Sequence, residues 1–264
     1  MIVDVHCGWG PTPAAPTWND AAAVRAALGE RGITGACIAS TLARRYDMLA
    51  GNETIAGIVA DASGESGLRG WLVLHPDQHE EAAKLMRRHL VKPGFVGVAL
   101  YPDTTTGEPV TLERNRELLN VFRRYSKALC IATPSGEAMH HVVEIAHYMG
   151  TTKILASGMG GEQWRTAVNL AAKPSNLFLD FSGVLDAEKI QYAIRQMNGL
   201  RRIVFGSGAP TTEPAAVLAL LDDLELSADE KHRICFTNAQ RLFGETQGAG
   251  GDADASARLA PMGE

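Results

Sequence analysis

Short apolar runs alternate along the chain with longer segments whose apolar positions recur at helical spacing. Eight runs are rich in Val, Ile, Leu and Phe and are bounded by Gly, Pro or Ser, which predicts buried strands. They cover residues 2–6, 33–40, 69–76, 95–102, 128–134, 152–158, 176–183 and 202–208. The segment after each run, such as 77–92 after the third, has the pattern of an amphipathic helix. This alternation is typical of βαβ units around a parallel sheet.

The number of units favours a closed barrel. Eight βα units within 264 residues fit a single α/β domain, a (β/α)8 TIM barrel over residues 1–244. An open doubly wound sheet is the alternative, but no G-x-G-x-x-G follows the first strand. From residue 245 onward the chain is rich in Gly, Ala and Asp, so we expect a disordered tail over 245–264.

Composition and charge narrow the classes of partner. The net charge is −5 and Lys and Arg are scattered, so the chain presents no basic field for nucleic acid. No signal-type N-terminus and no apolar run near the ~18 residues of a membrane span are present in the sequence. We therefore expect a cytoplasmic protein that binds neither nucleic acid nor membrane. Its four cysteines lack C-x-x-C spacing, which favours reduced core residues over a zinc or redox site.

Polar side chains stand where several predicted strands end. In a barrel the carboxyl ends of all strands meet at one rim, where active sites lie. The candidates for acid–base chemistry at this rim are His6, His75, Tyr101, Asp103 and Asp180. Ser182 shares a strand face with Asp180, whereas Cys7 follows His6 and is expected on the opposite face of the first strand.

The loop between the first strand and the first helix has two alternative interpretations. It carries Trp9 and Trp18 together with three prolines. It is either a lid over the barrel mouth or a surface loop with a Trp packed beneath it. The sequence leaves both open.

Seven short motifs at the strand ends and at the C-terminus carry a resemblance to a known family. They are DVHCGWG (4–10), PGFVGVALYP (93–102), CIATPSGE (130–137), ILASGMGG (154–161), FLDFSGV (178–184), FGSGAP (205–210) and NAQRLFG (238–244). Together they resemble the amidohydrolase-related family, in the branch of aminocarboxymuconate semialdehyde decarboxylase. The resemblance covers nearly all of residues 1–244 and implies a TIM barrel.

The resemblance also implies a metal site, and here the sequence departs from the family. The family's metal-ligand and assisting-histidine positions are occupied by His6, Gly8, Ala132, Gly158 and Gly208, and its strand-four lysine position by Ala99. A catalytic zinc site needs about three protein ligands, and only His6 remains. We therefore expect neither a metal nor another cofactor. Because the replacements are small, we expect Gly8, Ala99, Ala132, Gly158 and Gly208, with Ser182, to line a pocket at the barrel mouth.

Three functions are compatible with these residues. The first, favoured slightly, is a non-catalytic partner subunit, a pseudoenzyme that binds an active amidohydrolase paralogue or another biosynthetic enzyme, or that forms a homo-oligomer. The second is a metal-independent hydrolase, lyase or cyclase that acts on a small carboxylate-bearing molecule. The third is a small-molecule binding protein that uses the pocket at the mouth. Loss of the ligands favours the first and third, and the titratable groups at the rim favour the second.

Overall fold

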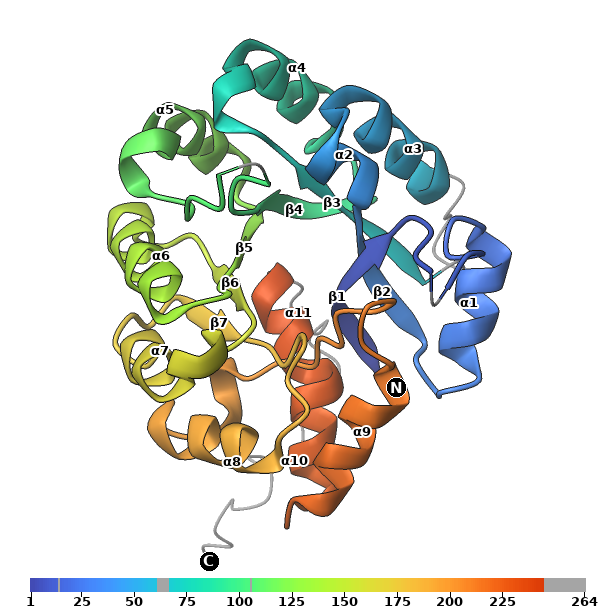
Figure 1. Cartoon of the computed structure of the whole chain (residues 1–264), viewed down its shortest axis with the longest axis vertical. Coiled ribbons are helices and arrows are strands. Elements are labelled where there is room, and N and C mark those ends of the chain that lie inside the picture. Colours follow the sequence, from blue (N-terminus) through green and yellow to red (C-terminus); the bar gives the residue numbers. More distant parts are fainter. Residues whose placement is uncertain (14, 61–66, 105, 245–264) are drawn as a thin grey trace, which may run out of the picture.

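The computed structural model describes residues 1–13, 15–60, 67–104 and 106–244. The tail predicted over 245–264 lies outside the described residues. Seven parallel strands follow one another in a single curled sheet, in the order β1 to β7, with the helices around its outer face (Figure 1). No described helix has the length and apolar character needed to cross a bilayer.

The strands are β1 (Val3–Trp9), β2 (Gly35–Ser40), β3 (Leu68–Val73), β4 (Phe95–Leu100), β5 (Ala128–Ala132), β6 (Ile154–Ser157) and β7 (Leu177–Leu179). The α-helices are α1 (Ala21–Gly29), α2 (Thr41–Arg45), α3 (Met48–Ala60), α4 (His79–His89), α5 (Leu112–Phe122), α6 (Gly136–Met149), α7 (Trp164–Ala171), α8 (Ala187–Gln196), α9 (Pro214–Asp223), α10 (Ala228–His232) and α11 (Asn238–Phe243). Four 3-10 turns, η1 (Pro76–Gln78), η2 (Arg123–Tyr125), η3 (Gly161–Gln163) and η4 (Leu200–Arg202), and a π-helical turn, η5 (Arg233–Thr237), complete the described elements. The α/β class and the first seven predicted strands are confirmed.

The strands alternate between two hydrophobic clusters. An outer cluster, which includes Ile38, Leu72 and Ile131, packs the sheet against the helices. An interior cluster on the other face of the sheet includes Cys37, Trp71, Val73, Cys130 and Phe178. Period-two alternation explains the division, since neighbouring residues of one strand point to opposite faces. The interior is thus a packed core and not a channel.

Helix α11 contributes to the interior cluster from the end of the sheet at which the strands begin. Its Ala239 and Leu242 are buried there. The Phe243 ring lies 5.8 Å from the ring of Trp71. Figure 1 shows α11 inside the ring of strands.

The eighth predicted strand, over residues 202–208, is wrong as a strand. The segment does lie between β7 and β1: Leu179 and Ile203 form one parallel bridge, and the Val5 N–H donates to Phe205 O at 2.9 Å. Val204 N–H also donates to Leu179 O and Gly208 N–H to His6 O, each at 3.0 Å. Between them, Phe205 N–H donates to Ile234 O and Ser207 N–H to the Asp4 side chain, which interrupts a regular ladder.

Asp4 adds a side-chain link to these backbone hydrogen bonds. It is fully buried, and its Oδ1 accepts from the backbone N–H groups of Ser207 at 3.0 Å and His6 at 3.1 Å. Its Oδ2 accepts from the Ser207 hydroxyl at 2.5 Å. Asp4 therefore holds the backbone of His6.

We predict that Asp4→Ala lowers the free energy of unfolding by about 2–4 kcal/mol, because it leaves buried N–H donors without an acceptor. Asp4→Asn keeps one acceptor oxygen, so its free energy of unfolding should lie between those of Asp4→Ala and the parent. Denaturant unfolding followed by tryptophan fluorescence measures both. Asp223→Ala, at an exposed position, is the matched control. Equal losses for Asp4→Ala and Asp223→Ala would show that the Asp4 link is dispensable.

Candidate active site

Four strands bring a cluster of polar side chains together at the rim where the strands end. His6 lies within β1, Tyr101 directly follows β4, Ser157 ends β6, and Asp180 directly follows β7, with Ser182 two residues later. Of the rim residues predicted from the sequence, His6, Tyr101, Asp180 and Ser182 therefore meet. The parallel sheet explains the meeting, because the strands all end at one side.

A β-bulge in the first strand directs His6 toward this cluster. Val3 and Val5 both pack with the interior cluster, so strict alternation would turn His6 outward. The pairing register of β1 with β2 shifts between Asp4 and Cys7. A bulge of this kind changes which face of the sheet the following side chains point to. His6 consequently reaches the interior side, while Cys7 is buried in the outer cluster as expected.

The His6 ring is hydrogen-bonded through both nitrogens. Its Nε2 lies 2.9 Å from the Tyr101 hydroxyl. Its Nδ1 lies 2.8 Å from the Ser157 hydroxyl and 3.1 Å from that of Ser182. The Ser182 hydroxyl in turn donates to Asp180 Oδ2 at 3.1 Å. A continuous chain of hydrogen bonds therefore runs from Tyr101 through His6 and Ser182 to Asp180.

The direction of each bond follows from the carboxylate. An ionised Asp180 only accepts, so the single Ser182 hydroxyl proton points toward it. When the Ser157 hydroxyl also points toward Asp180, the His6 Nδ1 carries the hydrogen and donates it to a serine oxygen. Nε2 of the neutral ring is left as an acceptor for the Tyr101 hydroxyl. In this state the Tyr101 proton points inward.

Burial shifts the pKa values of the two titratable groups in the hydrogen-bonded chain in opposite directions. It raises the pKa of Asp180 to about 7, although the backbone N–H groups of Gly158 and Ser182 and the Ser182 hydroxyl stabilise the carboxylate. Burial, together with the smaller effect of the positive charge of Arg44, lowers the pKa of His6 to about 4. A proton that enters the cluster near neutral pH is therefore held on Asp180 and not on His6.

Arg44 covers Tyr101, the outer end of the hydrogen-bonded chain. Its guanidinium carbon lies 4.4 Å from the centre of the Tyr101 ring, as in a cation–π contact. Its Nε is buried and has no hydrogen-bond partner within the described part of the chain. Burial raises the pKa of Tyr101 well above its usual range. The tyrosine therefore stays protonated beside a cation that has a free donor.

The donor set of the rim does not fit a divalent metal ion. Both His6 nitrogens are engaged with hydroxyl groups, and both Asp180 oxygens accept hydrogen bonds. Across residues 1–13, 15–60, 67–104 and 106–244, no three His, Cys, Asp or Glu side chains group so as to hold a metal. No step of the chemistry is assigned to a metal here.

The small residues at the family's ligand positions have structural reasons of their own. Gly158 has φ +88° and Gly208 has φ +74°, in the left-handed region that favours glycine. A Cβ on Gly8 would lie 3.3 Å from the Ala209 carbonyl oxygen. Ala99 is fully buried in the interior cluster, whereas Ala132 is partly exposed at the rim. Positive φ angles at Gly158 and Gly208 and close backbone approach at Gly8 therefore favour glycine at these three positions.

Two predicted rim residues, His75 and Asp103, lie apart from the hydrogen-bonded chain that contains His6. His75 Nε2 lies 2.8 Å from the Ala43 carbonyl oxygen, a structural bond. Asp103 Oδ1 accepts from the Thr106 N–H at 2.8 Å, and Oδ2 lies 3.4 Å from Arg114 Nη2. Asp103 therefore orders the loop after β4.

The loop with two indoles is anchored to the body of the protein. Trp9 and Trp18 are both buried in the outer cluster. The Trp18 Nε1–H donates to the Gly8 carbonyl oxygen at 2.8 Å. These contacts favour the surface-loop interpretation over the lid.

Two residues of the cluster were not identified from the sequence. One is Ser157, which binds the His6 ring. Its place directly before a family ligand position was the available signal. Arg44 lies in α2, which begins immediately after β2, so no strand-end pattern marked it.

A sequence profile described as amidohydrolase matches residues 3–244. None of the curated proteins matches the sequence. Among solved structures, 5-carboxyvanillate decarboxylase from Novosphingobium aromaticivorans, complexed with manganese, is 15% identical with TM-score 0.73, over 92% of this chain and 96% of that one. A putative amidohydrolase from Staphylococcus aureus is 13% identical with TM-score 0.72, over 92% and 99%.

A putative 2-pyrone-4,6-dicarboxylic acid hydrolase from Pseudomonas putida is 16% identical with TM-score 0.69, over 94% of this chain and 98% of that one. Identities this low show a shared fold. The profile covers nearly all of the described chain and confirms the resemblance first seen in the strand-end motifs. The chain belongs to the amidohydrolase family.

Proposed function

We propose that the protein is a metal-independent acid–base enzyme, a lyase or hydrolase that acts on a small carboxylate-bearing molecule at the rim. The hydrogen-bonded chain Tyr101–His6–Ser182–Asp180 carries this proposal. It gives a proton path that needs no metal, between the buried Asp180 carboxyl group and the hydroxyl of Tyr101, a partly exposed residue. The decarboxylases and hydrolases that share the fold make these two reaction classes the first to test.

The proton path works by reversal of its hydrogen bonds. Asp180 takes up a proton by a shift along the whole hydrogen-bonded chain: the Tyr101 hydroxyl proton moves to His6 Nε2, the Nδ1 hydrogen moves to Ser182 and the Ser182 hydrogen moves to Asp180, while a proton from solvent replaces the one that Tyr101 gave up. Nε2 then donates to the Tyr101 oxygen, which frees the Tyr101 hydroxyl proton for the substrate. One proton gained at Asp180 is thus delivered at Tyr101, and His6 never carries a net charge. A pKa of about 7 for Asp180 suits this exchange near neutral pH.

The chemistry balances for a decarboxylation. The carbon–carbon bond breaks, CO2 leaves, and its electron pair remains on the substrate carbon. That carbon takes the Tyr101 hydroxyl proton, and Tyr101 regains a proton from His6. The net consumption is one proton, which Asp180 supplies. Arg44 is suited to bind the substrate carboxylate, since its guanidinium lies over the Tyr101 ring and its Nε has a free donor.

The test is turnover without metal. The full chain is incubated in excess EDTA with 5-carboxyvanillate, 2,6-dihydroxybenzoate or 2-pyrone-4,6-dicarboxylate, the compounds in the names of proteins that share the fold. We expect CO2 release or ring hydrolysis with at least one of them, at the same rate with and without EDTA. Activity that EDTA abolishes and manganese restores would contradict the proposal.

Tyr101→Phe should reduce kcat about 10²- to 10⁴-fold, because it removes the hydroxyl that delivers the proton. Tyr46→Phe is the matched control, since Tyr46 is 82% exposed. Steady-state kinetics on the substrate found above measures both variants. An unchanged kcat in Tyr101→Phe would show that Tyr101 takes no part in the reaction.

Arg44→Met should raise KM about tenfold or more, because it removes a charge-assisted hydrogen bond to the substrate carboxylate. The neighbouring Arg45 is exposed, so Arg45→Met should leave KM unchanged. If the two variants behave alike in the same assay, Arg44 is not the carboxylate anchor.

The opposite pKa shifts predict a pH signature in stability. Between about pH 4 and 6.5, Asp180 is protonated in the folded protein but ionised in the unfolded protein. Over the same range, His6 is neutral in the folded protein but protonated in the unfolded protein. The two contributions cancel in the parent. Asp180→Asn leaves the His6 contribution, so stability should be lost as pH falls from 6.5 toward 4. His6→Gln leaves the Asp180 contribution, so stability should be lost as pH rises from about 4 toward 7.

Each slope should approach about 1.4 kcal/mol per pH unit. Urea unfolding at pH 4.5, 5.5 and 6.5 measures them, and His140→Gln, at an exposed position, serves as control. Parallel pH profiles for Asp180→Asn and His6→Gln would show that the two groups do not titrate as described.

A non-catalytic partner role is the second proposal. Leu42, Tyr46 and Leu49, at α2 and the start of α3, expose 43%, 82% and 45% of their surface. A partner subunit could cover these apolar side chains. Absence of turnover with all three compounds, together with a complex that Tyr46→Asp disrupts, would favour this role over catalysis.

A further inference from the structure

A hollow of about 920 Å³ lies at the end of the sheet where β6 and β7 begin, opposite the rim that carries His6. Pockets for small ligands commonly measure about 300–1,000 Å³. Segments that are distant in sequence form this hollow: the residues before β6 and β7, the turn η4, the end of η5, and α11. It is therefore separate from the polar cluster at the rim, and we call it the basic hollow for the charges described next.

All the charged side chains in the described wall of the basic hollow are positive. They are Lys153, Arg201, Arg202 and Arg241, and the described residues of the wall include no Asp or Glu. The chain as a whole is acidic, with 30 Asp and Glu against 25 Lys and Arg. Four cations in one hollow of an acidic protein create a local positive field, which attracts anions.

Within the described part of the chain, none of the four cations makes an ion pair with a carboxylate. Arg202 donates instead to backbone carbonyl oxygens, among them those of Pro174 at 2.7 Å and Leu177 at 3.1 Å. Burial lowers the pKa of Arg202. Lys153 Nζ donates to the Arg241 carbonyl oxygen. These bonds hold the side chains in place but leave their positive charge without a counterion.

A smaller hollow of about 190 Å³ continues the positive surface. It shares Thr151, Lys153 and Gly244 with the basic hollow and adds Arg123 and Lys127 to the wall. Among its described residues there is again no Asp or Glu. Cations therefore lie on both sides of the shared edge, an arrangement that suits a ligand with more than one anionic group.

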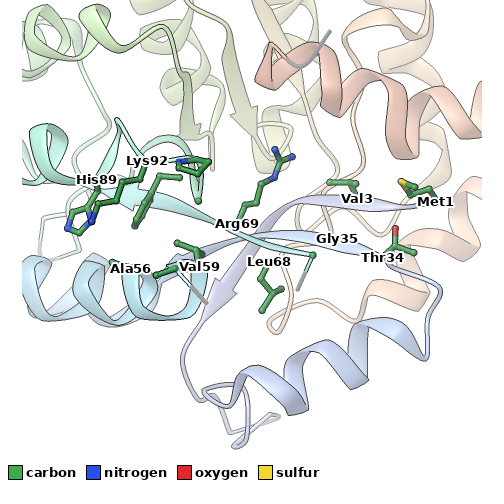
Figure 2. A pocket seen from close by; sticks show the side chains of 15 residues that line it. Met1, Val3, Thr34, Gly35, Ala56, Val59, Leu68, Arg69, His89 and Lys92 are labelled. Atoms are coloured by element: carbon green, nitrogen blue, oxygen red, sulfur yellow. The ribbon is translucent and has the colours of Figure 1, made fainter. Parts of the chain in front are cut away.

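The other large hollow at this end of the sheet has a different wall. It measures about 730 Å³ and lies where β1 to β4 begin. Figure 2 shows its basic residues Arg69 and Lys92 together with the apolar side chains of Ala56, Val59 and Leu68. This mixed wall makes it a comparison for the basic hollow within the same molecule.

We propose that the basic hollow binds a small polyanion, a molecule with two or more phosphate or carboxylate groups. Arg201 and Arg241 are both exposed, and their planar guanidinium groups bind the anionic oxygens in pairs. Arg202 and Lys153 add positive charge to the same wall. The site is independent of the chemistry proposed at the rim, where Arg44 is the anchor for a substrate carboxylate.

The experiment titrates pyrophosphate and citrate into the full chain at low salt, with acetate as the singly charged comparison. Calorimetry gives the affinities, and amide NMR shifts of Thr151 and Thr237, two residues of the wall, locate the site. We expect pyrophosphate or citrate to bind at least about tenfold more tightly than acetate, because several cations meet one ligand. The tighter of the two polyanions identifies phosphate or carboxylate as the preferred group.

Arg201→Gln and Arg241→Gln should each weaken binding of this polyanion about fivefold or more, since each removes a charge-assisted contact. Arg87→Gln, at an exposed position of α4, is the matched control. Lys92→Gln tests the hollow of Figure 2, and Arg44→Met tests the rim. These three variants should keep the parent affinity.

Three results would each overturn the proposal. The first is equal binding of acetate and both polyanions, and the second is no binding of either polyanion. The third is an affinity that falls in Lys92→Gln or Arg44→Met but is kept in Arg201→Gln and Arg241→Gln.

Discussion

The carboxylate of Asp4 is the interaction on which the geometry of the rim depends. The sheet has seven strands, and the segment after η4 reaches β1 without a ladder of its own. Asp4 binds the backbone and hydroxyl of Ser207 on one side and the His6 N–H on the other. Together with the backbone bonds from Val5 N–H to Phe205 O and from Gly208 N–H to His6 O, it fixes His6 relative to the chain that returns from β7.

The low polarity around the cluster separates the roles of its two titratable groups. Burial favours the neutral form of each, so the carboxyl group of Asp180 holds a proton more firmly and the His6 imidazole less firmly. An Asp180–His6 ion pair is consequently disfavoured. The histidine can pass a proton between its two nitrogens without storing it, and its fixed hydroxyl partners on both sides set the path.

Much of the fold followed from the sequence, because it depends on patterns that repeat. Strand alternation and helical period are local properties, and they located seven strands and the rim where His6, Tyr101 and Asp180 meet. The eighth strand is not regular because two of its N–H groups, those of Phe205 and Ser207, bond to Ile234 and to the Asp4 side chain, and strand patterning does not reveal these partners. The bulge in β1 and the position of Arg44 over Tyr101 are also products of tertiary packing. His75 and Asp103 show the reverse: strand-end position alone did not bring them into the cluster.

The positive φ angles of Gly158 and Gly208 bear on how the family can evolve. A ligand side chain at either position would have to adopt a left-handed backbone, at a cost of about 1–2 kcal/mol for each residue. A first mutation toward a metal site would thus reduce stability before enough ligands existed to bind an ion. In proteins that descend from this one, the backbone at these two glycines therefore opposes any single substitution that introduces a ligand side chain.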